Sequence, residues 1–286
     1  MQKKQEKCQS CGHDLTGNYC PNCGERRFDR SDLSLNRVLK HFLVSITNLD
    51  FNIFRSLYLL LLKPGFLTLE YLKGKRNTLL NPLQLFLLIN LIYFIVQPFT
   101  IANSFNNNLD SQISRQIYSP ITGKIIENKL KDADVKLIEE YHEDFNNKSE
   151  NLAKSLVIII VPFIAVLLQL LFFRSKKYFA EHLVFALHFM AYNLLINFTV
   201  ITLIMTPIIR LVINLERAVQ GLELTMALVL ILVSLLYSYA AMRRVYKQNR
   251  SITILKSVVV SLGFFPIIFI YRFILFFITY IWVGTF

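Results

Sequence analysis

Charge is scarce in this sequence. Charged residues make up 17% of the 286 residues, whereas soluble domains carry about a quarter. Hydrophobic residues reach 54% and collect in long blocks, which excludes an ordinary soluble domain and predicts a multispan membrane protein. The net charge is +12. In such a chain, Lys and Arg held on the cytosolic side of the membrane explain this excess better than nucleic-acid binding does.

Cysteine is absent after Cys23, and all four cysteines fall within residues 8–23. This placement excludes a disulfide framework in the later loops and fits a reducing compartment. The polar N-terminus also lacks an apolar secretion signal. We therefore expect the first 30 residues to stay in the cytosol.

The cysteines are spaced C-x2-C-x8-C-x2-C, with Gly12 and Gly24 directly after the two pairs. Each pair makes a tight turn that aims two thiolates at one point, and two such turns close a tetrahedral zinc site. We predict a structural Zn²⁺ in a zinc ribbon at residues 1–30, because residues 8–24 cannot bury a core and need the metal to fold. Iron–sulfur or redox chemistry is the alternative, and His13 is expected to lie in a loop. The predicted ligands are Cys8, Cys11, Cys20 and Cys23.

Residues 31–82 are expected to lie at the membrane surface. Apolar residues recur at helical spacing from Val38 to Ile46, which indicates an interfacial amphipathic helix. Residues 51–62 form a second apolar run, too short to span a core that needs about 20 residues. The junction that follows, residues 63–82, combines helix breakers with basic residues. It is either a plain membrane anchor or a binding site for anionic lipid or a protein partner, made by Lys63, Lys73, Lys75 and Arg76.

Residues 83–286 are predicted to form an all-α transmembrane domain of about five helices. A large loop at residues 103–153 holds one expected amphipathic helix around Tyr141 and Phe145, and is predicted to cap the domain. Pro162 predicts a kink in the second span, and Gly263 and Pro266 predict a bend or break in the fifth, unless its ends run past the core. The expected spans are residues 83–102, 152–173, 182–209, 222–242 and 252–282.

Basic residues predict the orientation of these spans. There are 13 Lys or Arg before the first span, three in the loop after the second and five in the segment that follows the fourth. The loop at residues 103–153 instead carries nine acids against six Lys or Arg. The positive-inside rule then places the N-terminus in the cytosol and the C-terminus outside it.

Polar residues inside the predicted spans are the other candidate site. Asn90, Tyr93 and Gln97 share a helical face of the first span, which favours packing through buried hydrogen bonds over a hydrophilic path. In the third span the favoured interpretation is an anchor at the exposed cytosolic edge plus a buried, hydrogen-bonded histidine; a proton relay or metal site is the alternative. This possible intramembrane polar site consists of third-span residues and the fifth-span arginine: Glu181, His182, His188, Tyr192, Asn193 and Arg272.

Arg272 lies well inside the fifth span. It could snorkel to the outer interface, pair with Glu216 or Glu223 of the outer loop, or bind an anionic headgroup.

Three stretches together resemble a bacterial family of multispan membrane proteins with an N-terminal zinc ribbon, known only as a domain of unknown function. They are the CxxCG…YCPNCG ribbon, the PGFLTLEYLKGKRNTLLNP junction and the AEHLVFALH stretch. The resemblance implies a protein of the bacterial inner membrane, and it brings no catalytic residues.

These features favour a non-enzymatic scaffold or assembly partner whose cytosolic face engages anionic lipid or another protein. A transporter or channel for a lipid or small ion is the alternative, and a membrane-embedded enzyme acting on lipid is the third hypothesis. The sequence shows no nucleophile elbow, phosphate-cradling glycine loop or carboxylate pair, which disfavours an ATPase or a soluble-type hydrolase.

Overall fold

The computed structural model describes residues 7–15, 17–24, 27, 52–75, 79–100, 105–131, 134–175, 177–213 and 219–283, without the side chains of residues 208–226. Helices dominate this part of the chain, and its β structure is limited to isolated bridge positions, such as the pair formed by Lys7 and Asp14. The all-α prediction is therefore confirmed. The expected helix at residues 38–46, the junction residue Arg76 and the side chains of Glu216 and Glu223 lie outside the described part.

Among the described residues, five helical rods are long and apolar enough to cross a membrane, which confirms the predicted number. They are Pro82–Phe99, Val135–Leu171, Phe179–Pro207, Ala227–Tyr246 and Arg250–Val283. Their helices are α4 (Pro82–Val96) with the 3₁₀ turn η2 (Gln97–Phe99); α7 (Val135–Leu156), the 3₁₀ turn η3 (Val157–Ile159) and α8 (Ile160–Leu171); α9 (Phe179–Tyr192), the π-helix η4 (Asn193–Ile201) and α10 (Thr202–Ile213); α11 (Val219–Tyr246); and α12 (Arg250–Val283).

The first span begins at a capping box. The Asn81 side chain accepts a hydrogen bond from the backbone of Leu83, and the Gln84 side chain accepts one from the backbone N–H of Asn81. Pro82 occupies the first helical position, where its missing N–H costs nothing. The proline that ends the junction therefore starts the span.

The second and fifth spans show what the prolines and Gly263 do. Pro162 lies just after η3, so the distortion it imposes falls in the turn before it. In α12 the helix runs unbroken through Gly263 and Pro266 for 34 residues, about 51 Å at 1.5 Å per residue, so its ends extend past a core of ~30 Å unless it tilts. A Cβ on Gly263 would lie 3.0 Å from a methyl group of Leu167, so this glycine allows α12 to approach α8.

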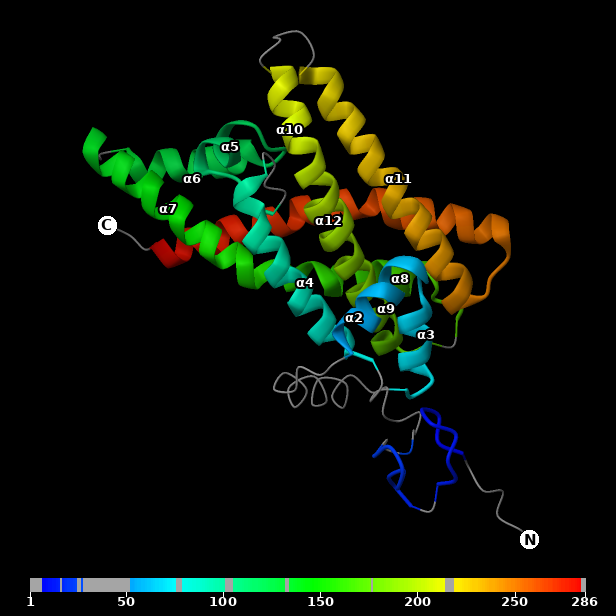
Figure 1. The fold of residues 1–286 in the computed structure, drawn as a ribbon. Coiled ribbons are helices and arrows are strands. Elements are labelled where there is room, and N and C mark those ends of the chain that lie inside the picture. Colours follow the sequence, from blue (N-terminus) through cyan, green and yellow to red (C-terminus); the bar gives the residue numbers. More distant parts are fainter. Residues whose placement is uncertain are drawn as a thin grey trace.

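The predicted amphipathic loop helix is the first part of α7, which continues directly into the second span. With α5 (Leu109–Ser114) and α6 (Ser119–Leu130) it packs on the last turns of α12 (Figure 1). Lys129 lies over the rings of Tyr141 and Tyr280, and burial lowers the pKa of its amine. This cap has its own small core: Leu109, Ile126, Tyr141, Phe145 and Phe276.

Two short helices precede the first span, α2 (Ile53–Leu62) and α3 (Phe66–Leu72), and we call residues 53–72 the α2–α3 hairpin. Figure 1 shows the hairpin beside α9 and the end of α11. Ser56 of α2 is fully buried and accepts a hydrogen bond from the backbone of Leu80. One face of α3 is buried in the bundle, whereas Phe54, Tyr58 and Leu62 leave an exposed apolar row on α2.

Candidate metal centre and polar sites of the membrane domain

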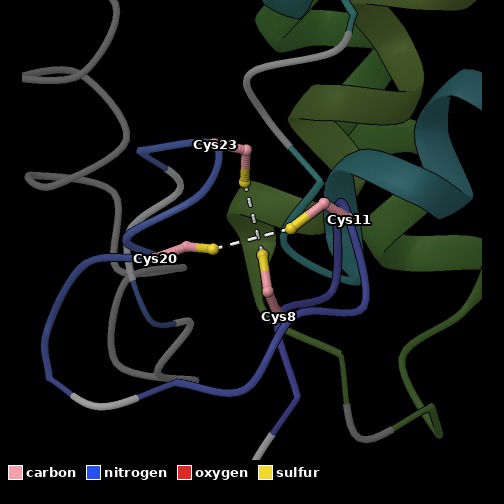
Figure 2. Close-up of side chains that lie close together, drawn as sticks. All are labelled: Cys8, Cys11, Cys20 and Cys23. Carbon is pink, nitrogen blue, oxygen red and sulfur yellow. Dashed lines mark hydrogen bonds between the residues drawn. The ribbon is translucent and has the colours of Figure 1, made fainter.

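The four cysteine side chains converge on one point (Figure 2). The Sγ atoms of Cys8 and Cys23 are 3.5 Å apart, as are those of Cys11 and Cys20, and all four lie within 4.8 Å of one another. Thiolates placed ~2.3 Å from a central ion in a tetrahedron would lie about 3.8 Å apart. The cluster therefore fits a four-thiolate metal site, and all four cysteines are free of disulfides.

Each cysteine pair is shaped by a tight turn that ends in glycine. The N–H of Gly12 donates to the carbonyl of Cys8 over 2.9 Å, and the N–H of Gly24 donates to that of Cys20 over 2.9 Å. Gly12 and Gly24 have φ angles of +77° and +69°, a left-handed conformation that favours glycine. The two turns are equivalent, as the repeated spacing predicts.

Electrostatics prepare the cluster for a metal ion. The pKa of the Cys11 thiol is lowered to about 6, chiefly by a backbone hydrogen bond at His13; burial opposes this shift, and side-chain hydrogen bonds with Cys23, Asn22 and Cys20 add to it. Metals bind the thiolate form, so a lowered pKa favours binding at neutral pH. The side chain of His13 is exposed, and four sulfur ligands leave no open coordination position for catalysis.

The basic residues of the junction do not share one environment. Lys63 is exposed at the end of α2. Lys73 and Lys75 both pair with Glu70 of α3, Lys73 over 2.8 Å, and their side chains stay 50% and 34% exposed. Burial tends to raise the pKa of Glu70, but the hydrogen bonds from the two lysines outweigh it, so its pKa is lowered.

The turn before α3 is locked onto the fourth span. Gly65 has a φ of +74°, and a Cβ there would lie 2.7 Å from the backbone oxygen of Ala241. The guanidinium of Arg244 donates to the carbonyl of Pro64 over 2.6 Å. These contacts hold the junction against α11, an arrangement that the predicted surface position did not include.

His188 matches the favoured interpretation of a buried, hydrogen-bonded histidine. It is 2% exposed, and its Nδ1 lies 3.0 Å from the hydroxyl of Thr68 on α3. Its backbone carbonyl also accepts from the hydroxyl of Tyr237 over 3.5 Å. The histidine thus joins the third span to the α2–α3 hairpin and to α11.

Glu181 and His182 differ from the expectation of an exposed edge, because both are buried. Lys177 pairs with Glu181 over 2.6 Å, and Nδ1 of His182 lies 2.7 Å from the hydroxyl of Tyr246. The ring of Tyr246 stacks on Phe172 at 3.7 Å between centroids. The second, third and fourth spans therefore meet at this stack. The ion pair with Lys177 offsets the desolvation cost of burying the charged Glu181.

The remaining predicted polar residues lie apart from this stack. Tyr192 stacks on Tyr237 with 3.8 Å between ring centroids, and the Asn193 amide donates to the carbonyl of Phe189 over 2.8 Å. Arg272 lies over the ring of Phe269 and interacts electrostatically with nearby tyrosines, Tyr118 among them. The structure does not bring Arg272 together with the polar residues at the start of α9.

The first-span residues behave as packing groups. The Asn90 amide donates to the carbonyl of Lys154 over 3.0 Å, which joins α4 to α7. Tyr93 is 1% exposed and packs edge-on against Phe105. These contacts agree with the favoured interpretation of buried hydrogen bonding between helices.

Sequence reasoning missed three residues that position these groups. Thr68 and Tyr246 are the partners of the two buried histidines, and Ala241 receives Gly65. In the junction, Thr68 is a polar residue among apolar residues at helical spacing. That pattern could have identified it as a positioning residue. Nothing in the sequence pairs it with a residue 120 positions later.

Residues 50–94 match the sequence model of a family described as "Protein of unknown function (DUF3667)". The match covers the α2–α3 hairpin, the basic junction and most of α4, so it confirms the resemblance to a domain of unknown function over these residues. No curated protein and no solved structure matches the chain.

Proposed function

We propose that this chain is a scaffold or assembly partner of the bacterial inner membrane, with its N-terminus in the cytosol and its C-terminus outside it. In this role the cytosolic zinc ribbon docks a protein partner, and the neighbouring basic face engages anionic lipid. The observation that carries the proposal is the closed cysteine cluster on a chain whose described part also has five helical rods long and apolar enough to cross a membrane. A closed four-sulfur site suits folding and docking, not catalysis.

Zinc is the proposed metal of the cluster. Four thiolates at tetrahedral spacing are the ligand set of structural zinc sites, and the metal would supply the energy that folds the ribbon. Iron or an iron–sulfur cluster also takes four thiolates. The surroundings of the cluster are exposed and have no hydrophobic core. They favour zinc, which is redox-inert.

Anionic lipid is the proposed partner of the junction. Lys63, Lys73 and Lys75 carry three positive charges, and Glu70 offsets one of them. Both paired lysines keep a third or more of their side-chain surface exposed, so they remain available to headgroups. Arg244 and the basic turn after α11 add charge at the same end of the bundle.

A lipid-retention measurement tests this part of the proposal. Full-length protein is equilibrated in mixed liposomes of anionic and zwitterionic lipid, and the co-purified lipids are counted by native mass spectrometry. We expect the triple variant Lys63→Gln, Lys73→Gln, Lys75→Gln to retain fewer anionic lipids. Each lysine near a headgroup contributes ~1 kcal/mol, roughly fivefold in affinity.

The matched control replaces three exposed lysines of the cap, at the opposite end of the bundle: Lys124→Gln, Lys131→Gln and Lys136→Gln. It removes the same charge and should leave anionic-lipid retention unchanged. If both triple variants lost anionic lipid equally, the loss would come from total charge and not from the junction. That result would contradict the proposed site.

A transporter or channel for a small ion is the second candidate, and one observation favours it. The third span carries a row of buried polar side chains, including His188, Asn193 and Asn197, and it turns into a π-helix in the middle. Buried polar groups and broken helices mark ion paths in membrane proteins. Binding of an ion in this row is the first requirement of that role.

A further inference from the structure

The third span changes its helical geometry at Asn193. From Asn193 to Ile201 the backbone forms a π-helix, which is rare and recurs at functional sites. Two threonine hydroxyls stabilise the wider turns: Thr199 donates to the carbonyl of Leu194 over 2.7 Å, and Thr202 donates to that of Asn197 over 3.0 Å. The segment therefore places backbone carbonyls and buried side-chain oxygens close together.

Asn197 has one polar atom left over inside this segment. Its amide nitrogen donates to Oδ1 of Asn193 over 2.7 Å and to the carbonyl of Leu230 on α11 over 3.2 Å. An amide group has two donors, and both are used. Its Oδ1 is buried without a partner, in a side chain that is 2% exposed.

Ser234 of α11 supplies a second such atom. Its hydroxyl oxygen is buried without a partner, and the residue is 2% exposed. The contacts of His182 with Tyr246 and of Asn197 with Leu230 show that α11 runs antiparallel to the third span. Because Ser234 lies one helical turn from Leu230, it stands beside the π-helix, level with Asn193.

If the third span crosses a bilayer from the start of α9, these two oxygens would lie near the middle of the membrane. Asn193 is about 16 Å along the helix from His182 at 1.5 Å per residue, and the apolar core of a bilayer is ~30 Å thick. Residues 179–207 contain no acid besides Glu181, and residues 227–246 contain none. Glu181 pairs with Lys177 at the start of α9, so no carboxylate of residues 179–207 or 227–246 is available to these oxygens.

The ligand chemistry follows from these atoms. An unseen water or ion is one explanation of a buried polar atom without a partner, beside strain and a catalytic role. Neutral oxygens suit a hard cation, and the lack of a carboxylate disfavours a divalent one, whose charge would stay uncompensated. Transporters hold sodium at the midplane with side-chain oxygens and the carbonyls of irregular helices.

We propose that Asn197 Oδ1 and Ser234 Oγ, with backbone carbonyls of the π-helix, bind a monovalent cation, sodium in the first instance. The site is independent of the zinc ribbon and the basic junction. The site provides the ion binding that the transport role requires. An ion held here permanently would equally serve to join the third and fourth spans.

Thermal unfolding of the full-length protein in detergent tests the site. The melting temperature is measured in sodium, potassium and choline chloride at one ionic strength. We expect a saturable rise in sodium, roughly 5 °C or more when sodium is about 100-fold above its Kd. The Ser234→Ala variant should lose this sodium-dependent rise, and Ser234→Thr, which keeps the hydroxyl, should retain it.

Ser238→Ala is the matched control, because this serine lies one turn further along α11 and its hydroxyl already bonds the carbonyl of Leu235. It should keep the sodium-dependent rise whatever its own stability. A melting temperature that is equal in sodium and choline would mean that the two oxygens hold only water, and it would overturn the proposal. A rise that survives Ser234→Ala would overturn it as well. Neither result depends on lipid retention at the junction.

Discussion

The two buried glutamates in the described part of the chain, Glu70 and Glu181, are each paired with lysine. Glu70 is 5% exposed and is held by two lysines, Lys73 and Lys75. An unpaired charge in that position would carry a large desolvation cost. The contacts of Glu70 with its two lysines therefore stabilise α3, and the lysines are also part of a basic surface.

Replacing Glu70 with glutamine tests this contact through its pH dependence. The pKa of Glu70 in the folded protein lies below its ordinary value of 4.5, so its pairing stabilises the fold above that pH and is lost as the pH falls through the folded pKa. At neutral pH we expect Glu70→Gln to lower the free energy of unfolding by about 1–3 kcal/mol. The deficit should shrink toward zero in acid, as followed by thermal melts across pH.

Glu150→Gln is the control for this prediction. Glu150 pairs with Lys154 over 3.3 Å, but both side chains are more than 40% exposed. Exposed pairs contribute ~0–1 kcal/mol, so this variant should melt close to the wild type at every pH. A deficit of Glu70→Gln that stays constant from neutral to acid pH would contradict the assigned role of its charge.

Among the elements, α3 is the one whose position decides the shape of the junction. Its seven residues contribute four buried side chains, and its start at Gly65 touches the backbone of α11. Thr68 then reaches His188 in the third span. The hairpin is thus attached to two spans.

Gly65→Ala tests this close approach. The new methyl group would meet the backbone of Ala241, which cannot rotate away, and alanine is strained at a φ of +74°. We expect a loss on the order of 3 kcal/mol, combining left-handed strain with overpacking. The measurement is the melting temperature of the purified protein.

Gly263→Ala serves as the comparison, since its new methyl group would meet only the end of the Leu167 side chain at 3.0 Å, within a regular helix. That side chain can shift, so the variant should stay within about 1 kcal/mol of the wild type. If both variants melted alike, the contact between Gly65 and α11 would not be the cause of the loss.

At the scale of the whole molecule, the ribbon and the membrane domain are stabilised by different forces. The membrane domain has a continuous core that joins all five spans and the α2–α3 hairpin. In the described part of the ribbon only Cys8 and Cys20 are buried. A metal ion held by the four cysteines would replace the missing core there.

Removing the metal should therefore unfold the ribbon and leave the membrane domain folded. We expect a chelator to make residues 7–27 sensitive to trypsin, while the helical circular dichroism signal and the melting temperature of the membrane domain stay constant. A Cys8→Ser, Cys11→Ser variant should be cleaved without chelator. A ribbon that resisted trypsin after complete metal removal would show that it folds without a metal, against our expectation.

The sequence by itself determined the class of this protein. Long apolar runs require helices in a membrane, because only a helix satisfies its own backbone in lipid, and they predicted the five spans. The cysteine spacing predicted the four-cysteine cluster, since two tight turns fix four sulfur atoms with little help from the rest of the chain. The match at residues 50–94 falls on the junction that the sequence singled out.

Only the tertiary structure decided which residues meet. Thr68 and His188, Gly65 and Ala241, and Asn197 and Leu230 are brought together by packing between helices that are far apart in the chain. It also placed Glu181 and His182 inside the bundle, where a position at the end of a span had predicted exposure. Helical periodicity tells which residues share a face, but side-chain packing between helices decides what that face touches.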